Sequence, residues 1–184
     1  MSSNKLHSQY EWLFERGINT KQRVIYINSE ICDFSFENIM IGFDLFEQTR
    51  DKPIRIDISS FGGSIYDMFG IVDRIRMSPC EVITRVFGKA MSAATLIAAS
   101  GDKRQITKNS WFMMHEPSDI ISGKVKEIRN DYIHLKELEK QMYNQYEEFS
   151  GGKLTEEQFK RLCSIDRYLP AQKVVDFGLA DEII

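Results

Sequence analysis

Along this chain, segments whose hydrophobic residues have the spacing of a β-strand alternate with segments whose hydrophobic residues have the spacing of an α-helix. From Ile54 to Ser59, isoleucine occupies every second position, which is typical of a strand with one buried face. Arg23 to Asn28 alternates in a similar way, and residues 35–49 place apolar side chains on one helical face behind a possible N-cap at Ser35. Residues 65–77 form a second helical pattern. This alternation predicts an α/β fold with a largely parallel sheet.

The segment from Glu81 to Gly101 carries the clearest candidate chemistry. Its β-rich run from Val82 to Phe87 predicts a strand, Gly88 breaks that strand, and the alanine-rich sequence after Ser92 favours a helix. A sharp turn from strand to helix exposes the residue at the turn beside free backbone N–H groups. Ser92 therefore has two interpretations. It is either a simple N-cap, the common role of serine at a helix start, or a nucleophile with oxyanion donors beside it.

Residues 123–149 form the longest helical pattern in the chain. Its apolar positions follow spacings of three and four, with lysine and glutamate filling the other faces. A helix of this length usually projects beyond a small domain, so we expect this one to pack against something else, and Gly151 and Gly152 to end it. The apolar row consists of Val125, Ile128, Tyr132, Leu135, Leu138, Met142, Tyr146 and Phe149.

Shorter elements complete the pattern. Residues 105–107 and 111–115 predict two short strands. A capping-box sequence at Thr155 predicts a short helix, and Pro170 suits the first turn of another. Residues 179–184 are expected to form a final strand or tail.

Composition limits the class of protein. The chain has 184 residues, of which 42% are hydrophobic and 28% charged, as expected for one globular domain spanning residues 1–184. The net charge of −3 gives no electrostatic case for binding nucleic acid or an anionic membrane. Three scattered cysteines without a CxxC pair, no apolar run of membrane-spanning length and a polar start indicate a cytoplasmic protein.

Serine catalysis needs a base, and the chain offers three histidines. His7 lies in the polar N-terminal segment, and His134 falls among lysines and glutamates of the long helix, where a solvated face is expected. His115 ends an apolar strand, so it is either a base at a strand end or a satisfied core histidine. Carboxylates are plentiful, and their spacing does not choose among them. The residues by themselves thus indicate a possible pair of Ser92 and His115.

Two adjacent glycines follow the strand from Ile54 to Ser59. Gly62 and Gly63 are either a tight turn or a place where the backbone of a bound peptide approaches closely. The phosphate-binding patterns G-x-G-x-x-G and P-loop are absent from the chain.

Four of these segments, in the same order, resemble the proteolytic subunit of the Clp protease. The similar segments are IRIDISSFGGS, GKAMSAATLIAASG, NSWFMMHEP and SIDRYLPAQKVVDFGLADEII. The resemblance implies that Ser92 is the nucleophile, His115 the general base and Asp166 the carboxylate that orients it. It also implies that Gly63 and Ala93 supply the N–H groups of the oxyanion hole.

The same resemblance implies a fold and an assembly. The fold would be the crotonase-like spiral of β-β-α units, with the helix at about residues 123–149 as a protruding handle. Members of the family form heptameric rings that pair into a tetradecamer, and they receive unfolded polypeptide from an ATP-driven AAA+ unfoldase. The expected activity is that of a serine endopeptidase, with no metal or cofactor.

Departures from the family concern the start of the chain and the substrate site. Residues 1–19 do not resemble the family's apolar N-terminal loop. Beside Gly62 and Gly63, the expected substrate-binding residues include Glu116 in place of a glutamine and Ile120 in place of a small residue. Two alternatives to a peptidase are a crotonase-type acyl-CoA hydratase or isomerase, and an inactive structural ring subunit.

Overall fold

A mostly parallel β-sheet forms the frame of the protein, and the computed structural model describes it within residues 10–184. The strand order is β1-β2-β3-β4-β5-β8, and β6 pairs with both β4 and β7. The β1–β2 and β6–β7 pairs are antiparallel and all other pairs are parallel, which confirms the expected α/β class with a largely parallel sheet. The strands are β1 (Ile18–Asn19), β2 (Val24–Ile27), β3 (Ile54–Ser60), β4 (Val82–Met91), β5 (Lys103–Ile106), β6 (Trp111–Met114), β7 (Arg167–Pro170) and β8 (Glu182–Ile183).

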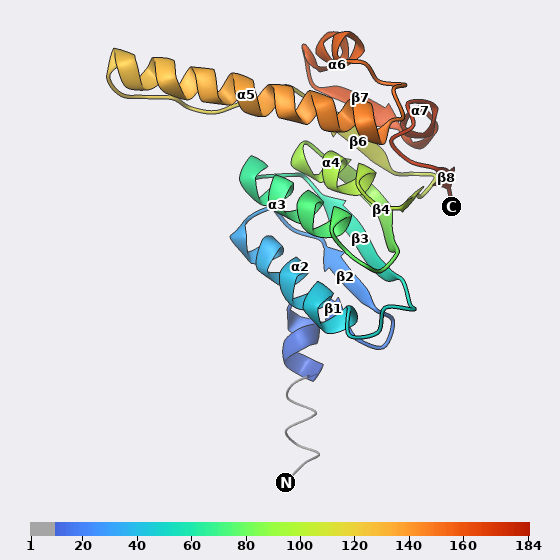
Figure 1. Ribbon diagram of the computed structural model, residues 1–184. Coiled ribbons are helices and arrows are strands. Elements are labelled where there is room, and N and C mark those ends of the chain that lie inside the picture. The colour runs from blue at the N-terminus through green and yellow to red at the C-terminus, as the bar shows by residue number, and fades with distance from the viewer. Residues whose placement is uncertain (1–9) are drawn as a thin grey trace.

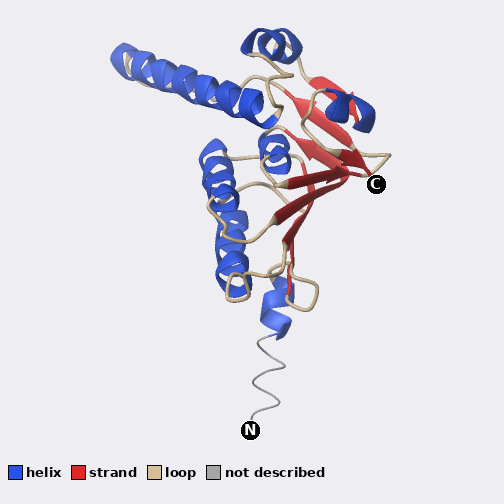
Figure 2. Cartoon of the chain, turned by 45° about the vertical axis from the view of Figure 1, so that its right-hand side comes forward, coloured by secondary structure: helices blue, strands red, loops and turns tan. Residues whose placement is uncertain are grey.

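Three helices cover one face of this sheet, and a much longer one crosses its end. Figures 1 and 2 show α2, α3 and α4 stacked along the same side of the strands, while α5 projects far beyond them. The chain at residues 10–15 is also helical. The other helices are α2 (Asp33–Phe46), α3 (Ile65–Arg76), α4 (Ala93–Ala99), α5 (Val125–Phe149), α6 (Glu156–Cys163) and α7 (Ala171–Asp176). None of the helices in the described part of the chain has both the length and the apolar composition needed to cross a membrane.

The period-two pattern of β3 separates the two faces of the sheet. Ile54, Ile56 and Ile58 are fully buried in the core beneath the helices, as the sequence predicts. On the opposite face, Asp57 accepts two hydrogen bonds of 2.8 Å from the Arg85 guanidinium on the neighbouring strand. The alternation therefore decides which side of the sheet receives helices α2 to α4.

Gly88 does not break the strand that precedes Ser92. Strand β4 continues through it to Met91, and its pairing with β3 shifts register beyond Ile58. Gly88 has a φ of +75°, which glycine adopts without steric cost, so the strand bends there and goes on. The bend matters for the site because the first part of β4 pairs with β5, whereas its last residues pair with β6.

The N-terminus of α2 differs from the prediction. The N-cap is Cys32, and Ser35 lies inside the first turn of the helix. The Ser35 hydroxyl oxygen accepts the Cys32 N–H at 2.9 Å and its hydrogen is donated to the Cys32 carbonyl at 2.8 Å. Ser35 thus satisfies the backbone before the helix, which is the part that an N3 side chain plays in a capping box.

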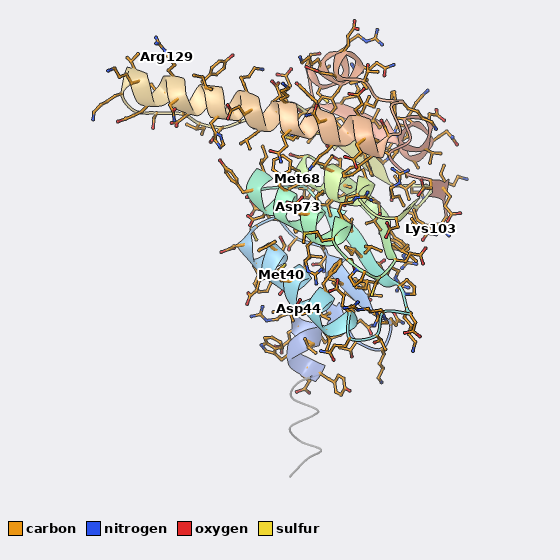
Figure 3. The ribbon with its side chains drawn as sticks, in the orientation of Figure 1. Met40, Asp44, Met68, Asp73, Lys103 and Arg129 are labelled. Atoms are coloured by element: carbon orange, nitrogen blue, oxygen red, sulfur yellow. The ribbon has the colours of Figure 1, made fainter. Side chains whose placement is uncertain are left out.

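Helix α5 confirms the long helical pattern, but its apolar row has three environments. The base of the helix is buried in the chain's own core through Met142, Tyr146 and Phe149. The outer half is exposed, with Val125 75% and Tyr132 55% accessible. Arg129, labelled in Figure 3, lies near this outer end, away from the rest of the protein. Between the two halves, Leu135 and Leu138 line a cavity.

The C-terminal segment fixes the base of α5 to the sheet. The expected capping box at Thr155 is confirmed by its hydroxyl accepting the Gln158 N–H at 3.3 Å, and residues 182–183 form the final strand, β8. Arg104 of β5 donates to the Phe149 carbonyl at 2.5 Å and to the Gly178 carbonyl at 2.9 Å. Phe149 is the last residue of α5 and Gly178 lies just after α7, so one guanidinium satisfies carbonyl groups at the ends of both helices.

Candidate active site

Ser92 occupies the turn between β4 and α4. Its backbone has φ +51° and ψ −127°, a strained conformation for a residue with a side chain. Its N–H donates to the Met113 carbonyl of β6 at 2.7 Å, which fixes the turn against the neighbouring strand. The side chain makes no capping hydrogen bond, although Ser92 holds the N-cap position. The simple capping interpretation therefore fails for the hydroxyl, which is turned toward a histidine.

That histidine is His115, at the end of the strand beside β4. Its Nε2 lies 2.7 Å from the Ser92 Oγ. The two residues meet because β4 and β6 are parallel neighbours with Met91 opposite Met113, so their carboxyl ends lie together. A hydroxyl can donate to Nε2 only when the ring proton is on Nδ1. In that tautomer, His115 is placed to accept the proton of Ser92.

Asp166 lies next to this pair by strand register. Strand β7 runs antiparallel to β6, and their last registered pair is Met114 with Arg167. His115 directly follows β6 and Asp166 directly precedes β7, so both residues lie just beyond the same end of this antiparallel pair. The Asp166 side chain is exposed and forms no hydrogen bond or ion pair within residues 10–184. The topology thus places the two residues at the same end of the β6–β7 pair, and no hydrogen bond joins their side chains.

Two backbone N–H groups beside Ser92 are free to bind an oxyanion. The Gly62 carbonyl accepts the Ile31 N–H and the Ser64 N–H donates to the Ile31 carbonyl, which leaves the Gly63 N–H without an acceptor in the described chain. Ala93 is the first residue of α4, where an N–H has no partner inside its helix. Both residues line the cavity that contains Ser92 and His115.

Positions 62 and 63 require glycine for two reasons: their φ angles are positive, and a Cβ atom at either position would clash with neighbouring atoms. Gly62 has a φ of +97°, and a Cβ there would lie 2.7 Å from the Ser92 Cβ. Gly63 has a φ of +148°, and a Cβ there would lie 2.2 Å from the Ile31 carbonyl oxygen. Any other residue would push this loop away from Ser92.

A cavity of about 400 Å³ opens beside Ser92 and His115. It is lined by residues 63–66, by Ala93, by residues 117–119 and by one face of α5. Of the four expected substrate-binding residues, Gly63 lines this cavity and Gly62 is buried behind it. Glu116 and Ile120 are exposed outside it, and Ile120 is 94% accessible.

The contribution of α5 to the cavity was missed in the sequence. Asp131, Leu135, Leu138 and Met142 line it together, and their spacing of four, three and four residues puts them on one helical face. His134 also lines the cavity, and its side chain is 50% accessible, so the expected solvated position is confirmed. Its Nε2 is 2.8 Å from the Tyr66 hydroxyl of α3, which bridges the two helices. The helical spacing was visible in the sequence, whereas the face that it turns to Ser92 was not.

Other reactive groups lie away from this site or are inactive. Cys163 is buried, and this burial raises the pKa of its thiol to about 12, so the thiol is protonated at neutral pH and is a poor nucleophile. Within residues 10–184 there is no cluster of three or more His, Cys, Asp or Glu side chains placed to hold a metal ion. His7 lies outside the described residues.

Comparisons with known proteins identify the family. The family model described as Clp protease matches residues 10–184. A protein of Mycolicibacterium paratuberculosis named ATP-dependent Clp protease proteolytic subunit 2 is 28% identical over 176 residues, which cover 94% of this chain and 86% of that protein. A Chlorella vulgaris protein named ATP-dependent Clp protease proteolytic subunit is 28% identical over 167 residues, covering 89% and 82%.

These matches agree with the architecture and confirm the fold class expected from the sequence, the crotonase-like α/β spiral with a protruding handle helix, which is α5. The identity of 28% to both relatives marks the chain as distant from them. The chain belongs to the Clp protease family, as a divergent member.

Proposed function

We propose that this protein is a serine endopeptidase that hydrolyses peptide bonds of unfolded polypeptides. The observation that carries the proposal is the 2.7 Å contact between Ser92 Oγ and His115 Nε2 at a strained strand-to-helix turn. If Ser92 were only an N-cap and His115 only a core histidine, neither the strained Ser92 backbone nor the contact between the two side chains would be needed. The family of the chain and the printed names of its relatives, which are proteolytic subunits, support the same activity.

The geometry supports acyl transfer in two steps. His115 takes the proton of Ser92 as the Oγ attacks the carbonyl carbon of the scissile bond, and the Gly63 and Ala93 N–H groups stabilise the negative oxygen that forms. His115 then gives this proton to the leaving amine, and the C–N bond breaks. A water molecule hydrolyses the acyl-enzyme by the reverse sequence of proton transfers and restores Ser92.

In this proposal, Asp166 orients His115. The two residues lie just beyond the same end of the β6–β7 pair. A bond between the Asp166 carboxylate and the His115 Nδ1–H would hold the ring in the tautomer that accepts the Ser92 proton. The free state of the Asp166 carboxylate leaves it available for this role.

We further propose that the chain works inside an assembly. Heptameric rings paired into a tetradecamer would enclose the active sites, and an AAA+ unfoldase would supply unfolded polypeptide at the expense of ATP. The names of the relatives contain the term ATP-dependent, which supports a partner of this kind. The exposed apolar residues at the outer half of α5 support contact with another subunit.

The test combines labelling with mutation. A fluorophosphonate probe, read by mass spectrometry of peptides, is expected to modify Ser92, and Ser92→Ala is expected to lower cleavage of a short fluorogenic peptide by about 10⁴-fold or more. Native mass spectrometry should show the same assembly for both proteins. An adduct on Ser64 or Ser118, which also line the cavity, would contradict the assignment. No adduct, with no peptide cleavage, would favour an inactive ring subunit or an acyl-CoA hydratase.

A further inference from the structure

A buried chain of hydroxyl groups connects helix α5 to the nucleophile turn. The Tyr146 hydroxyl at the base of α5 lies 2.5 Å from Thr95 Oγ1 in α4. Thr95 Oγ1 in turn lies 2.6 Å from the carbonyl oxygen of Ser92. Thr95 is fully buried and Tyr146 is only 2% accessible, so water does not compete for these bonds.

The direction of the chain follows from the number of hydrogens. A carbonyl oxygen only accepts, so Thr95 donates its single hydroxyl hydrogen to Ser92. Thr95 has no second hydrogen to give, and Tyr146 must therefore donate to Thr95. Burial raises the pKa of Tyr146 above its ordinary value of 10.0, so the phenol keeps its hydrogen at neutral pH.

The end of this chain controls the direction of an oxyanion donor. The carbonyl of Ser92 and the N–H of Ala93 belong to one planar peptide group, in which they point in opposite directions. The backbone N–H of Thr95 also donates to this carbonyl, at 3.0 Å, and the shorter bond from the Thr95 hydroxyl adds a second constraint on its direction and so on that of the Ala93 N–H. This peptide follows a residue at φ +51° and ψ −127°, a strained conformation that the surrounding structure must hold in place.

We propose that Tyr146 is a positioning residue that aims the Ala93 N–H at the oxyanion through Thr95 and the Ser92 carbonyl. The proposal rests on the proposed peptidase function and adds a residue to it. It also makes the base of α5 part of the catalytic geometry, because a displacement of Tyr146 would release the Thr95 hydroxyl. Oxyanion donors act in the transition state, so the effect belongs in kcat rather than in substrate binding.

Tyr146→Phe removes only the hydroxyl and keeps the ring, whose centroid is 4.8 Å from that of Phe159. We expect kcat for a fluorogenic peptide to fall about 5- to 20-fold. This is less than the roughly 10²- to 10³-fold loss of kcat that follows complete removal of one oxyanion-hole donor, because the Ala93 N–H is still present. KM should stay within about twofold, and the pH profile of kcat/KM should not move, because His115 is untouched. The affinity for a peptide boronate, whose Ser92 adduct is tetrahedral, should fall by the same factor as kcat.

Tyr143→Phe is the matched control. Tyr143 lies on the same helix and packs on the same Phe159 ring at 4.8 Å, but its hydroxyl interacts with Glu139 of its own helix and not with α4. This variant should keep the wild-type kcat. Thr95→Val should lose at least as much as Tyr146→Phe, whereas Thr95→Ser, which retains the hydroxyl, should recover most of kcat.

A second measurement does not depend on activity. Hydrogen exchange at the amides of residues 93–99 should become faster in Tyr146→Phe and Thr95→Val but not in Tyr143→Phe. Equal kcat in Tyr146→Phe and Tyr143→Phe, with Ser92 still labelled by the fluorophosphonate, would overturn the positioning role and leave the peptidase intact. If the fluorophosphonate did not label Ser92 in the wild-type protein, the proposed peptidase function would be overturned. Unchanged hydrogen exchange in Tyr146→Phe would then also overturn the proposed link from Tyr146 through Thr95 to the Ser92 carbonyl.

Discussion

Single side chains at the site differ in how firmly they are held. Ser92 and His115 are bonded to each other, and the Ser92 backbone is tied to β6 through Met113. Asp166 has no such partner, although it directly precedes β7 at the end of the strand pair that His115 follows. An exposed carboxylate without a partner costs little to leave unpaired, so the Asp166 side chain is free to adopt another rotamer.

Asp166→Asn tests the proposed orienting role at the scale of one residue. The substitution keeps the shape of the side chain but removes the charge that stabilises the imidazolium, so we expect peptide cleavage to fall by about 10²- to 10⁴-fold. Circular dichroism should show an unchanged fold. Glu116→Gln, at an exposed carboxylate adjacent to His115 in sequence, serves as the comparison. Full activity of Asp166→Asn together with loss in Glu116→Gln would assign the orienting role to Glu116.

At the scale of elements, an ion pair fixes α3 against α2. Arg74 of α3 donates two hydrogen bonds of 2.8 Å to the two carboxylate oxygens of Glu47, which follows α2. The guanidinium also lies 4.7 Å from the Phe43 ring centroid of α2. Only 13% of the Arg74 and 19% of the Glu47 side chain is accessible, so solvent screens this pair less than a surface pair.

Glu47→Gln should destabilise the protein in a pH-dependent way. The hydrogen bond from Arg74 lowers the pKa of Glu47 below its ordinary value of 4.5. The pair therefore stabilises the fold fully above pH 4.5, and this contribution is lost as the pH falls through the lower folded value. We expect Glu47→Gln to lower the free energy of unfolding by about 1–2 kcal/mol at pH 7.

Urea denaturation at several pH values and matched protein concentration measures this difference, which should shrink below pH 4.5. The control is Asp73→Asn on α3, at an exposed carboxylate with no side-chain ion pair in residues 10–184 (Figure 3). Its effect on stability should be small at every pH. A difference for Glu47→Gln that is the same at pH 7 and at acid pH would show that the loss is not electrostatic.

At the scale of the whole molecule, the outer half of α5 exposes several large apolar side chains to solvent. Ile128, Tyr132 and Ile133 are 39%, 55% and 52% accessible on a helix that projects from the body. From the sequence we expect this helix to pack against something outside the domain, and the apolar row could have served as a whole for contact between rings. Leu135 and Leu138 instead line the cavity beside Ser92, so the surface available to a second subunit is confined to the outer half.

Replacing Ile128 and Tyr132 by aspartate should therefore disrupt ring pairing and leave the monomer folded. Burying carboxylates without partners at such an interface is strongly unfavourable, so native mass spectrometry should show single rings or monomers in place of a double ring. Met77→Asp, at a residue that is 79% accessible at the end of α3, is the control and should assemble normally. An intact double ring in the double variant would place the interface elsewhere.

Much of the local structure is determined by the sequence alone. The alternating isoleucines of β3, the long apolar period of α5, the capping box at Thr155 and the glycines that end helices each have a local physical cause that is visible in the residues. The four segments similar to the Clp protease subunit named Ser92 and His115, and the structure brings these two into contact. Local errors arose where a residue had two possible roles, as at Gly88 and Ser35.

Only the tertiary structure decided which distant groups meet. Spacing along the chain could not choose among the many carboxylates, because the nearness of Asp166 to the end of β6 depends on β7 pairing with β6 across more than 50 residues of sequence. The same holds for the face of α5 that lines the cavity and for the bond from Tyr146 to Thr95. Period and composition fix which side of an element is buried, but strand order and helix packing fix what that side touches, and this is why the site was only partly predictable.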